Sequence, residues 1–368
     1  MGKTDTVNTP LQKQGDHDRR IPLLERTALV PDTSISDDTE LQPSGQLRTV
    51  VAENISASSW QDLTENLLIS NGLAPSSAQM IMGSLRRTTQ RQYHCYIVQF
   101  INFCNSKFDQ VTEFTVINFL QVLYDRGLGY STINTASSAV KTFLELMQVD
   151  IGSVHNLVRF KKGVFNSRPS LPKHVQTWDP QIVLDYLATY DGVVNQMFLA
   201  RKCAVLLALS SYQRVSTLHS LKVSDLSFYD DRVVMVFPGL LKQSRPGFHL
   251  SGLELPVYKT NEKICVVSCL RQYLQLTAPF RQDNADLSAV FITCNKPYRC
   301  ASKDTIARWI KSIIHEAGIP VEFSAHSTRS ASTSSDVAKG VDVSKILAKA
   351  GWSSSSVFHK FYNKPVHR

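Results

Sequence analysis

From residue 60 to about residue 157 the chain alternates between apolar and polar positions with the period of an α-helix. After Leu85 the apolar side chains recur every three or four residues, which places one set on a single helical face: Tyr93, Tyr96, Ile97, Phe100, Ile101 and Cys104. Residues 115–123 form a second amphipathic stretch, and Ser131 is the predicted N-cap of a third that runs to Met147. Such short helices with one buried face predict a compact all-helical domain over residues 59–157.

Residues 179–368 mix helical and strand periodicities. Asp179 followed by Pro180 predicts a helix start, because aspartate caps helices and proline suits their first turn. Further predicted elements are helices at 195–208, 265–277 and 304–317, and strands at 232–237, 253–257 and 289–293. The whole chain is therefore expected to be mainly α with a small β-sheet, a helical domain being followed by an α+β domain.

Two segments lack a clear period. Residues 1–58 are rich in Asp, Ser, Thr, Gln and Pro, and predict a disordered leader. Residues 158–178 combine prolines with basic side chains and predict a basic linker between the domains. A basic linker of this kind is able to follow a phosphate backbone, although a plain interdomain connector has nearly the same composition.

Composition narrows the class of protein. Hydrophobic residues make up 43% of the chain, enough for ordinary cores, and no run is apolar for the length of a membrane span. The seven cysteines are scattered and odd in number, and the N-terminus has no apolar signal core, which favours reduced thiols. A zinc site drawn from four of them fits no strong zinc pattern, so we expect neither a metal nor a cofactor; the four are Cys265, Cys269, Cys294 and Cys300.

The charge is positive and unevenly distributed. The net charge is +9, yet residues 1–58 hold six Lys and Arg against nine Asp and Glu. The acidic leader therefore precedes a basic remainder, which favours a polyanionic partner. Charge alone does not separate DNA from RNA or from an acidic protein.

The C-terminal part carries side chains suited to phosphodiester chemistry. His326 and Arg329 lie three residues apart, and Trp352 precedes Tyr362 by ten. Planar guanidinium groups hold the non-bridging oxygens of a phosphate through paired hydrogen bonds, and a tyrosine hydroxyl is a candidate nucleophile. A second guanidinium is available from Arg214, which follows an apolar helical stretch.

Taken in order, these residues resemble the signature of the tyrosine recombinases, the phage integrase family. The resemblance implies that Arg214, His326, Arg329 and Trp352 activate the phosphate and that Tyr362 attacks it, forming a 3′-phosphotyrosyl link without a metal. The family's general acid is a lysine on a β-hairpin, which here implies Lys242, with Lys259 and Lys222 as alternatives. It further implies a helical core-binding domain and a catalytic domain over residues 179–368 that close around double-stranded DNA as a C-shaped clamp. Family members usually act as homotetramers on two DNA sites.

Within the family, residues 213–219, 241–247 and 325–332 look most like recombinases of eukaryotic mobile elements of the DIRS and crypton type. This resemblance implies site-specific recombination or integration of a mobile element, and residence in the nucleus. Two positions depart from the common pattern: Thr217 stands where many members have an acidic residue, and Trp352 replaces a commoner histidine.

Basic side chains outside the catalytic set are the predicted DNA contacts: Arg86, Arg87, Arg91, Lys161, Lys162 and Arg245. Two other functions stay open from the sequence. One is a domesticated, catalytically silent DNA-binding protein derived from such a recombinase. The other is a DNA-relaxing activity of the type IB topoisomerase kind, which uses similar chemistry.

Overall fold

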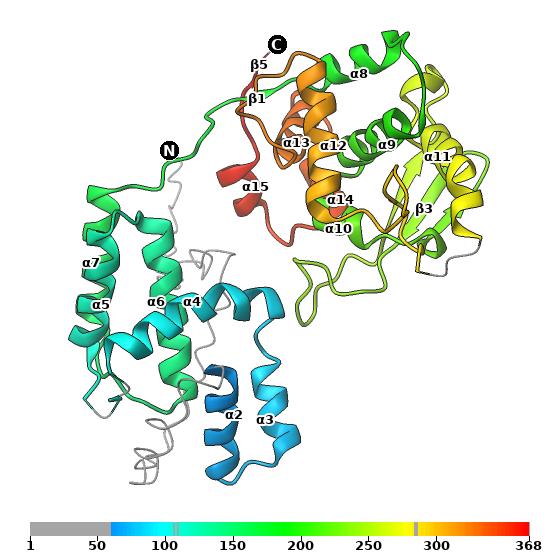
Figure 1. Cartoon of the computed structure of the whole chain (residues 1–368). Helices are drawn as coiled ribbons and strands as arrows, with labels where there is room; N and C mark the ends of the chain where they lie inside the picture. The colour runs from blue at the N-terminus through cyan, green and yellow to red at the C-terminus, as the bar shows by residue number, and fades with distance from the viewer. Residues whose placement is uncertain (1–59, 106, 109, 283–285, 368) are drawn as a thin grey trace, which may run out of the picture. The chain divides into compact units, whose positions relative to one another are not determined.

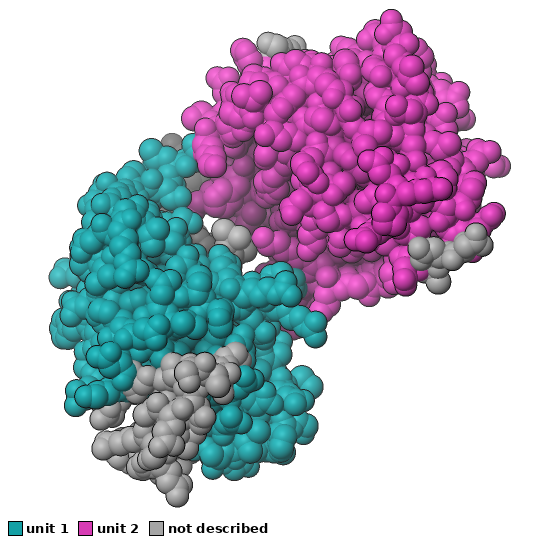
Figure 2. Space-filling view, in the orientation of Figure 1, with its two compact units in different colours: residues 1–172 teal, residues 173–368 magenta. Residues whose placement is uncertain are grey.

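The computed structural model describes residues 60–105, 107–108, 110–282 and 286–367, so the predicted leader lies outside the described residues. The chain divides into two compact units, residues 1–172 and 173–368 (Figures 1 and 2). The fold is mainly helical with a small sheet, which confirms the predicted fold class. None of the described helices has the length and apolar character needed to cross a membrane.

The first unit is an assembly of amphipathic helices. Its core is made by α4, α5 and α6, whose buried faces include Phe100, Phe119 and Phe143. The α4 face is the one the periodicity predicts, with Tyr93, Ile97, Phe100 and Ile101 buried. The helices are α2 (Trp60–Ser70), α3 (Pro75–Met82), α4 (Arg87–Phe103), α5 (Glu113–Asp125), α6 (Tyr130–Leu146) and α7 (His155–Ser167).

Two helix starts differ from their predicted positions. α5 begins at Glu113, because the Thr112 hydroxyl caps it by accepting from the Thr115 backbone N–H at 3.4 Å. α6 begins at Tyr130 with Gly129 as its N-cap, so the prediction of Ser131 as the cap was wrong by two residues. The glycine carries extended backbone there without any capping side chain.

The prediction of an irregular linker over residues 158–178 was wrong for its first half, because α7 occupies residues up to Ser167. Leu157 and Val164 lie two turns apart on one face of α7 and are both buried. The Glu113 carboxylate also accepts from the Leu157 backbone N–H at 2.7 Å, which satisfies a free donor at the start of the helix. Basic side chains between the apolar positions hid this period in the sequence.

The second unit places helices around a short antiparallel sheet. Its helices are α8 (Pro180–Thr189), α9 (Gln196–Ser211), α10 (Val215–Ser220), α11 (Val266–Arg281), α12 (Lys303–Glu316), α13 (Ser327–Ala338), α14 (Val343–Ala350) and α15 (Ser355–Phe361), with 3-10 turns η2 (Val223–Asp225) and η3 (Glu262–Ile264). Its strands are β1 (Thr177–Trp178), β2 (Leu226–Phe228), β3 (Arg232–Val236), β4 (Gly252–Pro256) and β5 (Val366–His367).

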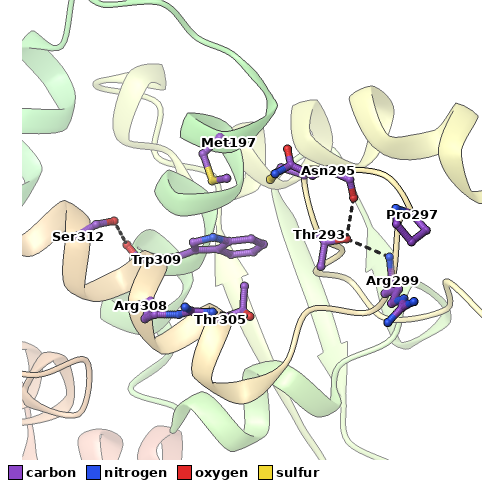
Figure 3. Close-up of a pocket in the computed structure, with 10 residues that line it drawn as sticks. Met197, Thr293, Asn295, Pro297, Arg299, Thr305, Arg308, Trp309 and Ser312 are labelled. Atoms are coloured by element: carbon purple, nitrogen blue, oxygen red, sulfur yellow. Dashed lines mark hydrogen bonds between the residues drawn. The ribbon is translucent and has the colours of Figure 1, made fainter.

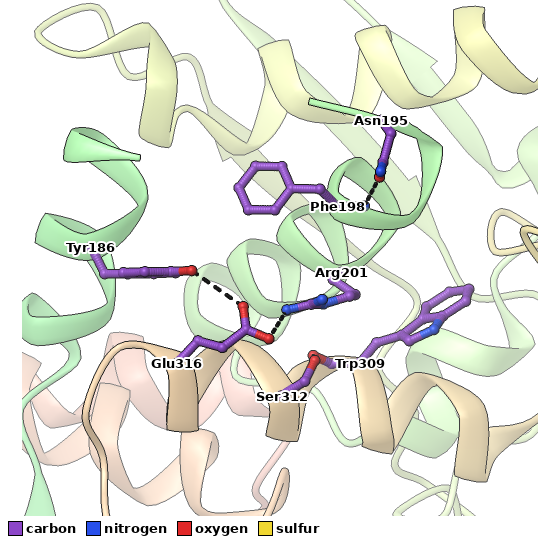
Figure 4. Close-up of polar contacts among 7 residues, drawn as sticks. All are labelled: Tyr186, Asn195, Phe198, Arg201, Trp309, Ser312 and Glu316. Carbon is purple, nitrogen blue, oxygen red and sulfur yellow. Dashed lines mark hydrogen bonds and ion pairs between the residues drawn. The ribbon is translucent and has the colours of Figure 1, made fainter. Parts of the chain in front are cut away.

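Helix α9 runs through the core of this unit. It is buried on nearly every side, as expected for a helix whose apolar residues do not gather on one stripe. It packs against α11, α12 and α13. On its outer side, Glu316 of α12 accepts from Tyr186 of α8 at 3.2 Å and pairs with Arg201 of α9, which ties three helices together (Figure 4).

The sheet has the order β2-β3-β4 and is antiparallel throughout, and the predicted pair of strands forms its β3 and β4. The strand predicted at 289–293 does not form; Ala289 and Ile292 make only isolated bridges to Lys222 and Cys300. A separate parallel pair joins β1 to β5, with Thr177 opposite Val366. This pair fixes the C-terminal segment against the start of the unit.

A small apolar cluster seats the last helix. Phe358 of α15 is fully buried among Tyr212, Ile346, Ala350 and Trp352. The main core of the unit is a separate cluster. The position of α15, and of the residue that follows it, therefore depends on very few side chains.

We expect Phe358→Ala to lower the free energy of local opening of α15 by about 3 kcal/mol, because it leaves a cavity in a cluster too small to close around it. Native-state hydrogen exchange of the α15 amides measures this opening. Phe361→Ala, in the same helix but 50% exposed, is the matched control and is expected to change the opening by less than about 0.5 kcal/mol. Equal effects of the two substitutions would contradict this account of α15.

Candidate active site

The first arginine of the predicted set lies just beyond the end of α9. The helix stops at Ser211, and Tyr212 turns the chain through the left-handed region with φ 57°. Gln213 is 2% exposed, and its side-chain amide donates to the Lys349 carbonyl at 2.8 Å. Arg214 then becomes the N-cap residue of α10 with a half-buried side chain. These contacts set the direction in which Arg214 leaves the core.

His326 and Arg329 enter the site from the start of α13. His326 is the N-cap residue, and Arg329 follows one turn later with only 1% of its surface exposed. The Arg329 guanidinium donates to the Tyr212 carbonyl at 2.5 Å and to the Ala350 carbonyl at 2.7 Å. Its central carbon lies 4.1 Å from the centre of the Trp352 ring. Arg329 therefore holds the end of α9, the end of α14 and Trp352 in one arrangement.

Tyr362 follows directly after α15. The Ser334 hydroxyl of α13 donates to the Tyr362 carbonyl at 2.6 Å and accepts from the Lys364 backbone N–H at 3.0 Å. The Tyr362 ring lies against Trp352, with the ring centres 4.6 Å apart. Its hydroxyl oxygen is 3.3 Å from Nε2 of His326. The backbone and the ring are thus both held, and the hydroxyl points at the imidazole.

Lys242 lies in the loop between β3 and β4, as predicted, with its side chain exposed. Its positive charge is one of four that act on His326, the others being those of Arg214, Arg329 and Lys364. The alternatives Lys222 and Lys259 are not among these charges. The charge of Lys242 is therefore near enough to His326 to lower the pKa of its imidazole, and the choice of Lys242 as the general acid stays a prediction.

The electrostatic setting keeps His326 neutral. Although the residue is exposed, desolvation of its ring, followed by the positive charges of Arg214, Arg329 and Lys242, lowers the pKa of His326 to about 4. Even at an exposed ring, neighbouring cations disfavour the imidazolium and lower the pKa of the histidine. A neutral imidazole at pH 7 has a ring nitrogen able to accept from the Tyr362 hydroxyl.

Arg329 stays charged in the same setting. Burial, followed by the charge of Arg214, lowers the pKa of Arg329 to about 9, which leaves the guanidinium protonated at neutral pH. Among the described residues no carboxylate forms an ion pair with this guanidinium, which donates to the two carbonyl oxygens. Its positive charge is therefore not cancelled by an acidic side chain.

Buried polar atoms without partners occur at several places among the described residues, and three of those at the site are N–H donors. Within the described part of the chain, the Arg329 Nε, the Trp352 Nε1 and the Gln243 Nε2 are buried N–H groups with no hydrogen-bond partner. Unpaired buried polar groups are rare, because each costs about 1–3 kcal/mol. All three carry donors, and the neighbouring ionic groups are cations. Such a place suits an acceptor-rich anion.

The six predicted catalytic side chains thus come from five segments of one unit. Arg329, Trp352 and Tyr362 are in mutual contact, Tyr362 also contacts His326, and Arg214 and Lys242 act on His326 through their charges. Thr217, where many family members have an acidic residue, is buried and donates its backbone N–H to the Arg214 carbonyl at 2.8 Å. The chemical roles of the six residues stay predictions.

The predicted DNA contacts are divided between the units. Arg86, Arg87 and Arg91 are exposed at the start of α4 in the first unit. Of the α7 pair, Lys162 is exposed, whereas Lys161 is half-buried and donates to the Asn134 side chain at 3.3 Å.

Arg245 belongs to the second unit, in the same loop as Lys242. It is exposed and donates to the Ser353 hydroxyl at 2.9 Å. This contact gives Arg245 a place in holding the loop, which the sequence did not predict. Its DNA contact stays a prediction.

Two residues of the site were not predicted from the sequence. Gln243 accepts from Arg214 at 3.0 Å, and Ser334 fixes the backbone of Tyr362. The only signal for Ser334 is the run of small polar residues in α13, most of which are buried. The sequence offers no sign of a role for Gln243 beyond its position next to Lys242, because its hydrogen-bond partner Arg214 is 29 residues away.

A hollow of about 680 Å³ lies elsewhere in the second unit, between the start of α9, α12 and the turn around Pro297 (Figure 3). Trp309 forms part of its lining, and none of the six predicted catalytic residues does. A duplex binds along an open surface rather than inside a small cavity, so this separation does not conflict with the predicted site. Among the residues that the structure covers, no group of three or more His, Cys, Asp or Glu side chains is suitable for a metal.

Comparisons with known proteins identify two domains of the chain. Residues 185–367 match the phage integrase family, and residues 75–150 match the N-terminal SAM-like domain of phage integrases. The chain therefore carries both domains of the phage integrase family, the tyrosine recombinases, and the predicted family is confirmed at this level. No curated protein matches the chain.

Solved structures of the same fold include DNA complexes. The XerH site-specific recombinase bound to its palindromic difH substrate, in a post-cleavage complex, has a TM-score of 0.55 at 14% identity, covering 85% of this chain and 91% of that one. The Tn1549 transposon integrase in complex with transposon right end DNA has a TM-score of 0.53 at 16% identity, covering 83% and 95%. At these identities the likeness shows the fold alone.

We expect removal of a neighbouring cation to raise the pKa of His326. In Arg214→Ala the imidazolium form loses one repulsive charge, so the pKa moves upward from about 4 toward the ordinary histidine value. NMR titration of the His326 ring protons measures the change. Lys311→Ala, which removes an exposed cation of α12 that is not among the charges acting on His326, is the control. An unchanged pKa in Arg214→Ala would contradict the proximity of the two groups.

Proposed function

We propose that this protein cleaves and rejoins DNA strands at specific sites through a 3′-phosphotyrosyl intermediate, in recombination or integration of a mobile element. The observation that carries the proposal is the Tyr362 hydroxyl, 3.3 Å from a neutral His326, beside buried N–H donors that lack acceptors. A nucleophile, a proton acceptor and a cationic, donor-rich space for a phosphate are the parts that this reaction requires.

Cleavage forms one bond and breaks one. The Tyr362 oxygen bonds to the phosphorus, and the bond from phosphorus to the 5′ oxygen breaks. The tyrosine proton leaves through His326, and the Lys242 ammonium gives a proton to the departing 5′ oxygen. The products are a 3′-phosphotyrosyl link and a free 5′ hydroxyl, and attack by the 5′ hydroxyl of a second strand reverses the step.

The two arginines serve the phosphate differently. Arg214 is half-buried and keeps N–H groups for direct hydrogen bonds to the non-bridging oxygens. Arg329 is almost wholly buried and uses two N–H groups on carbonyls, so it acts mainly as a fixed positive charge behind the phosphate. Removing one such stabilising group costs about 3–4 kcal/mol of transition-state stabilisation.

Double-stranded DNA is the proposed partner. The net charge of +9 and the exposed arginines at the start of α4 favour a polyanion. XerH and the Tn1549 integrase, which share the fold, are both seen in complexes with DNA. By the same analogy we propose a homotetramer on two DNA sites. Kinship with DIRS and crypton elements, and residence in the nucleus, belong to the same proposal and rest on the motifs of the sequence.

The nucleophile is tested by trapping. Sites selected from random duplex DNA would be converted into nicked suicide substrates, on which the wild-type chain is expected to form a covalent adduct. Tyr362→Phe should abolish the adduct and leave DNA binding unchanged, because only the hydroxyl is lost. Tyr258→Phe removes the hydroxyl of a tyrosine that is 48% exposed and outside the site, and serves as the matched control.

An adduct that survives in Tyr362→Phe would reassign the nucleophile. Specific binding by the wild-type chain without any adduct would instead support the catalytically silent DNA-binding protein. Relaxation of a supercoiled plasmid by the monomer, without strand exchange between two sites, would support the topoisomerase-like activity.

The first unit is expected to contribute phosphate contacts. Each such contact adds about 0.9 to the slope of log affinity against log salt. Arg87→Gln combined with Arg91→Gln should therefore lower the slope by about 1.8 and weaken binding to all sequences alike. Lys141→Gln removes a cation on α6 that pairs with Glu145, and is the control. An unchanged slope in the double variant would remove these arginines from the interface.

A further inference from the structure

The loop between β3 and β4 is fastened at several points. At its base, the Phe237 backbone N–H donates to the Ser251 carbonyl at 2.8 Å. His249 links the two sides, since one ring nitrogen donates to the Phe237 carbonyl at 2.9 Å and the other contacts the Ser244 hydroxyl at 2.7 Å. At the tip, Arg245 and Phe248 exchange two backbone hydrogen bonds. The loop therefore has a defined conformation.

The residues on either side of Lys242 are anchored in different places. Leu241 is 5% exposed and belongs to the main core of the unit. Gln243 points into the candidate site, where its side-chain oxygen accepts from Arg214 at 3.0 Å. The Lys242 backbone thus lies between a buried leucine and a half-buried glutamine that is hydrogen-bonded to Arg214, and the Lys242 side chain is exposed.

The Gln243 amide also lies against the turn that precedes Trp352. A Cβ added at Gly351 would come within 2.8 Å of the Gln243 nitrogen, so a side chain at residue 351 would displace the amide from its present position. The left-handed backbone of Gly351, with φ 68°, favours glycine for a second reason. Gln243 therefore connects the Lys242 loop with Arg214 on one side and with the Trp352 turn on the other.

The length and chemistry of the Gln243 side chain fit its position between Arg214 and the turn at Gly351. One end of the amide accepts from a guanidinium, and the other end is a buried donor without a partner among the described residues. A carboxylate here would cancel the charge of Arg214, and a shorter amide would not span the same gap. The donor is left facing a site that suits an anion.

We infer that Gln243 is a positioning residue, which fixes the Lys242 loop to Arg214 and so sets Lys242 beside the scissile phosphate. The inference rests on the proposed function, in which Lys242 protonates the departing 5′ oxygen. Without the Gln243 contact the loop keeps its base through His249 and its tip through the bond from Arg245 to Ser353, but the residue next to Lys242 loses its hydrogen bond with Arg214.

The test uses two suicide substrates that differ in one atom. One is ordinary DNA, and the other carries sulfur in place of the 5′ bridging oxygen at the scissile phosphate. A thiolate leaves without being protonated, so cleavage of the sulfur substrate does not need a general acid, whereas general acids contribute about 10²–10⁴-fold on the ordinary one. The rate of covalent adduct formation is measured on both.

Gln243→Ala is expected to slow adduct formation about tenfold or more on ordinary DNA and less than about threefold on the sulfur substrate. Lys242→Ala should show the same pattern with a larger loss. Arg214→Ala should be slow on both, because its contacts are with the non-bridging oxygens. Gln275→Ala, an exposed glutamine of α11, is the matched control and should equal the wild type on both substrates.

A loss in Gln243→Ala that is equally large on the two substrates would overturn the inference, because Gln243 would then act through Arg214 or through folding. A Lys242→Ala loss that sulfur does not relieve would overturn it as well. If the proposed function itself is wrong, the wild-type chain forms no adduct on either substrate, so the two failures can be told apart.

Discussion

The buried guanidinium of Arg329 is the interaction on which the rest of the site depends. It donates to carbonyls at the ends of two helices: Tyr212 caps α9, and Ala350 is the last residue of α14. Helix ends leave carbonyls without partners and carry partial negative charge, so they stabilise a cation without neutralising it. A carboxylate in the same place would have held Arg329 equally well and would have repelled a phosphate.

This choice of acceptors has a cost in stability. Arg214, Arg329, Lys242 and Lys364 all act on His326 with the same sign, and three buried donors near them lack partners. Like charges and unpaired donors are normally avoided in a core, and they persist where function requires them. The surrounding apolar contacts of Trp352 and Phe358 offset part of the cost, which explains why an aromatic cluster lies directly behind the polar one.

Much of the fold was predictable from local patterns, and where the prediction of a helix failed the cause was local. The α4 face followed from a regular apolar period, whereas α7 was missed because basic residues lie between Leu157 and Val164. The six residues of the predicted catalytic set could be singled out from the sequence because their side chains, in this order along the chain, resemble the signature of the family, and their chemical roles stay predictions. Gln243 and Ser334 were not, because each works through contacts with segments far away in sequence.

The turns that end α9 and α14 show how contacts between distant segments constrain the sequence. Both turns use left-handed residues, Tyr212 after α9 and Gly351 after α14, and both offer a carbonyl near the turn to Arg329. Glycine suits the second turn because of its left-handed backbone, and a side chain there would also displace the Gln243 amide. At the first turn a tyrosine accepts the unfavourable backbone, because its hydroxyl donates to Asp336 and its ring lies under Lys349. The strain at Tyr212 is therefore balanced by contacts with α13 and α14, the helices whose relative position decides where Arg329 and Trp352 meet Tyr362.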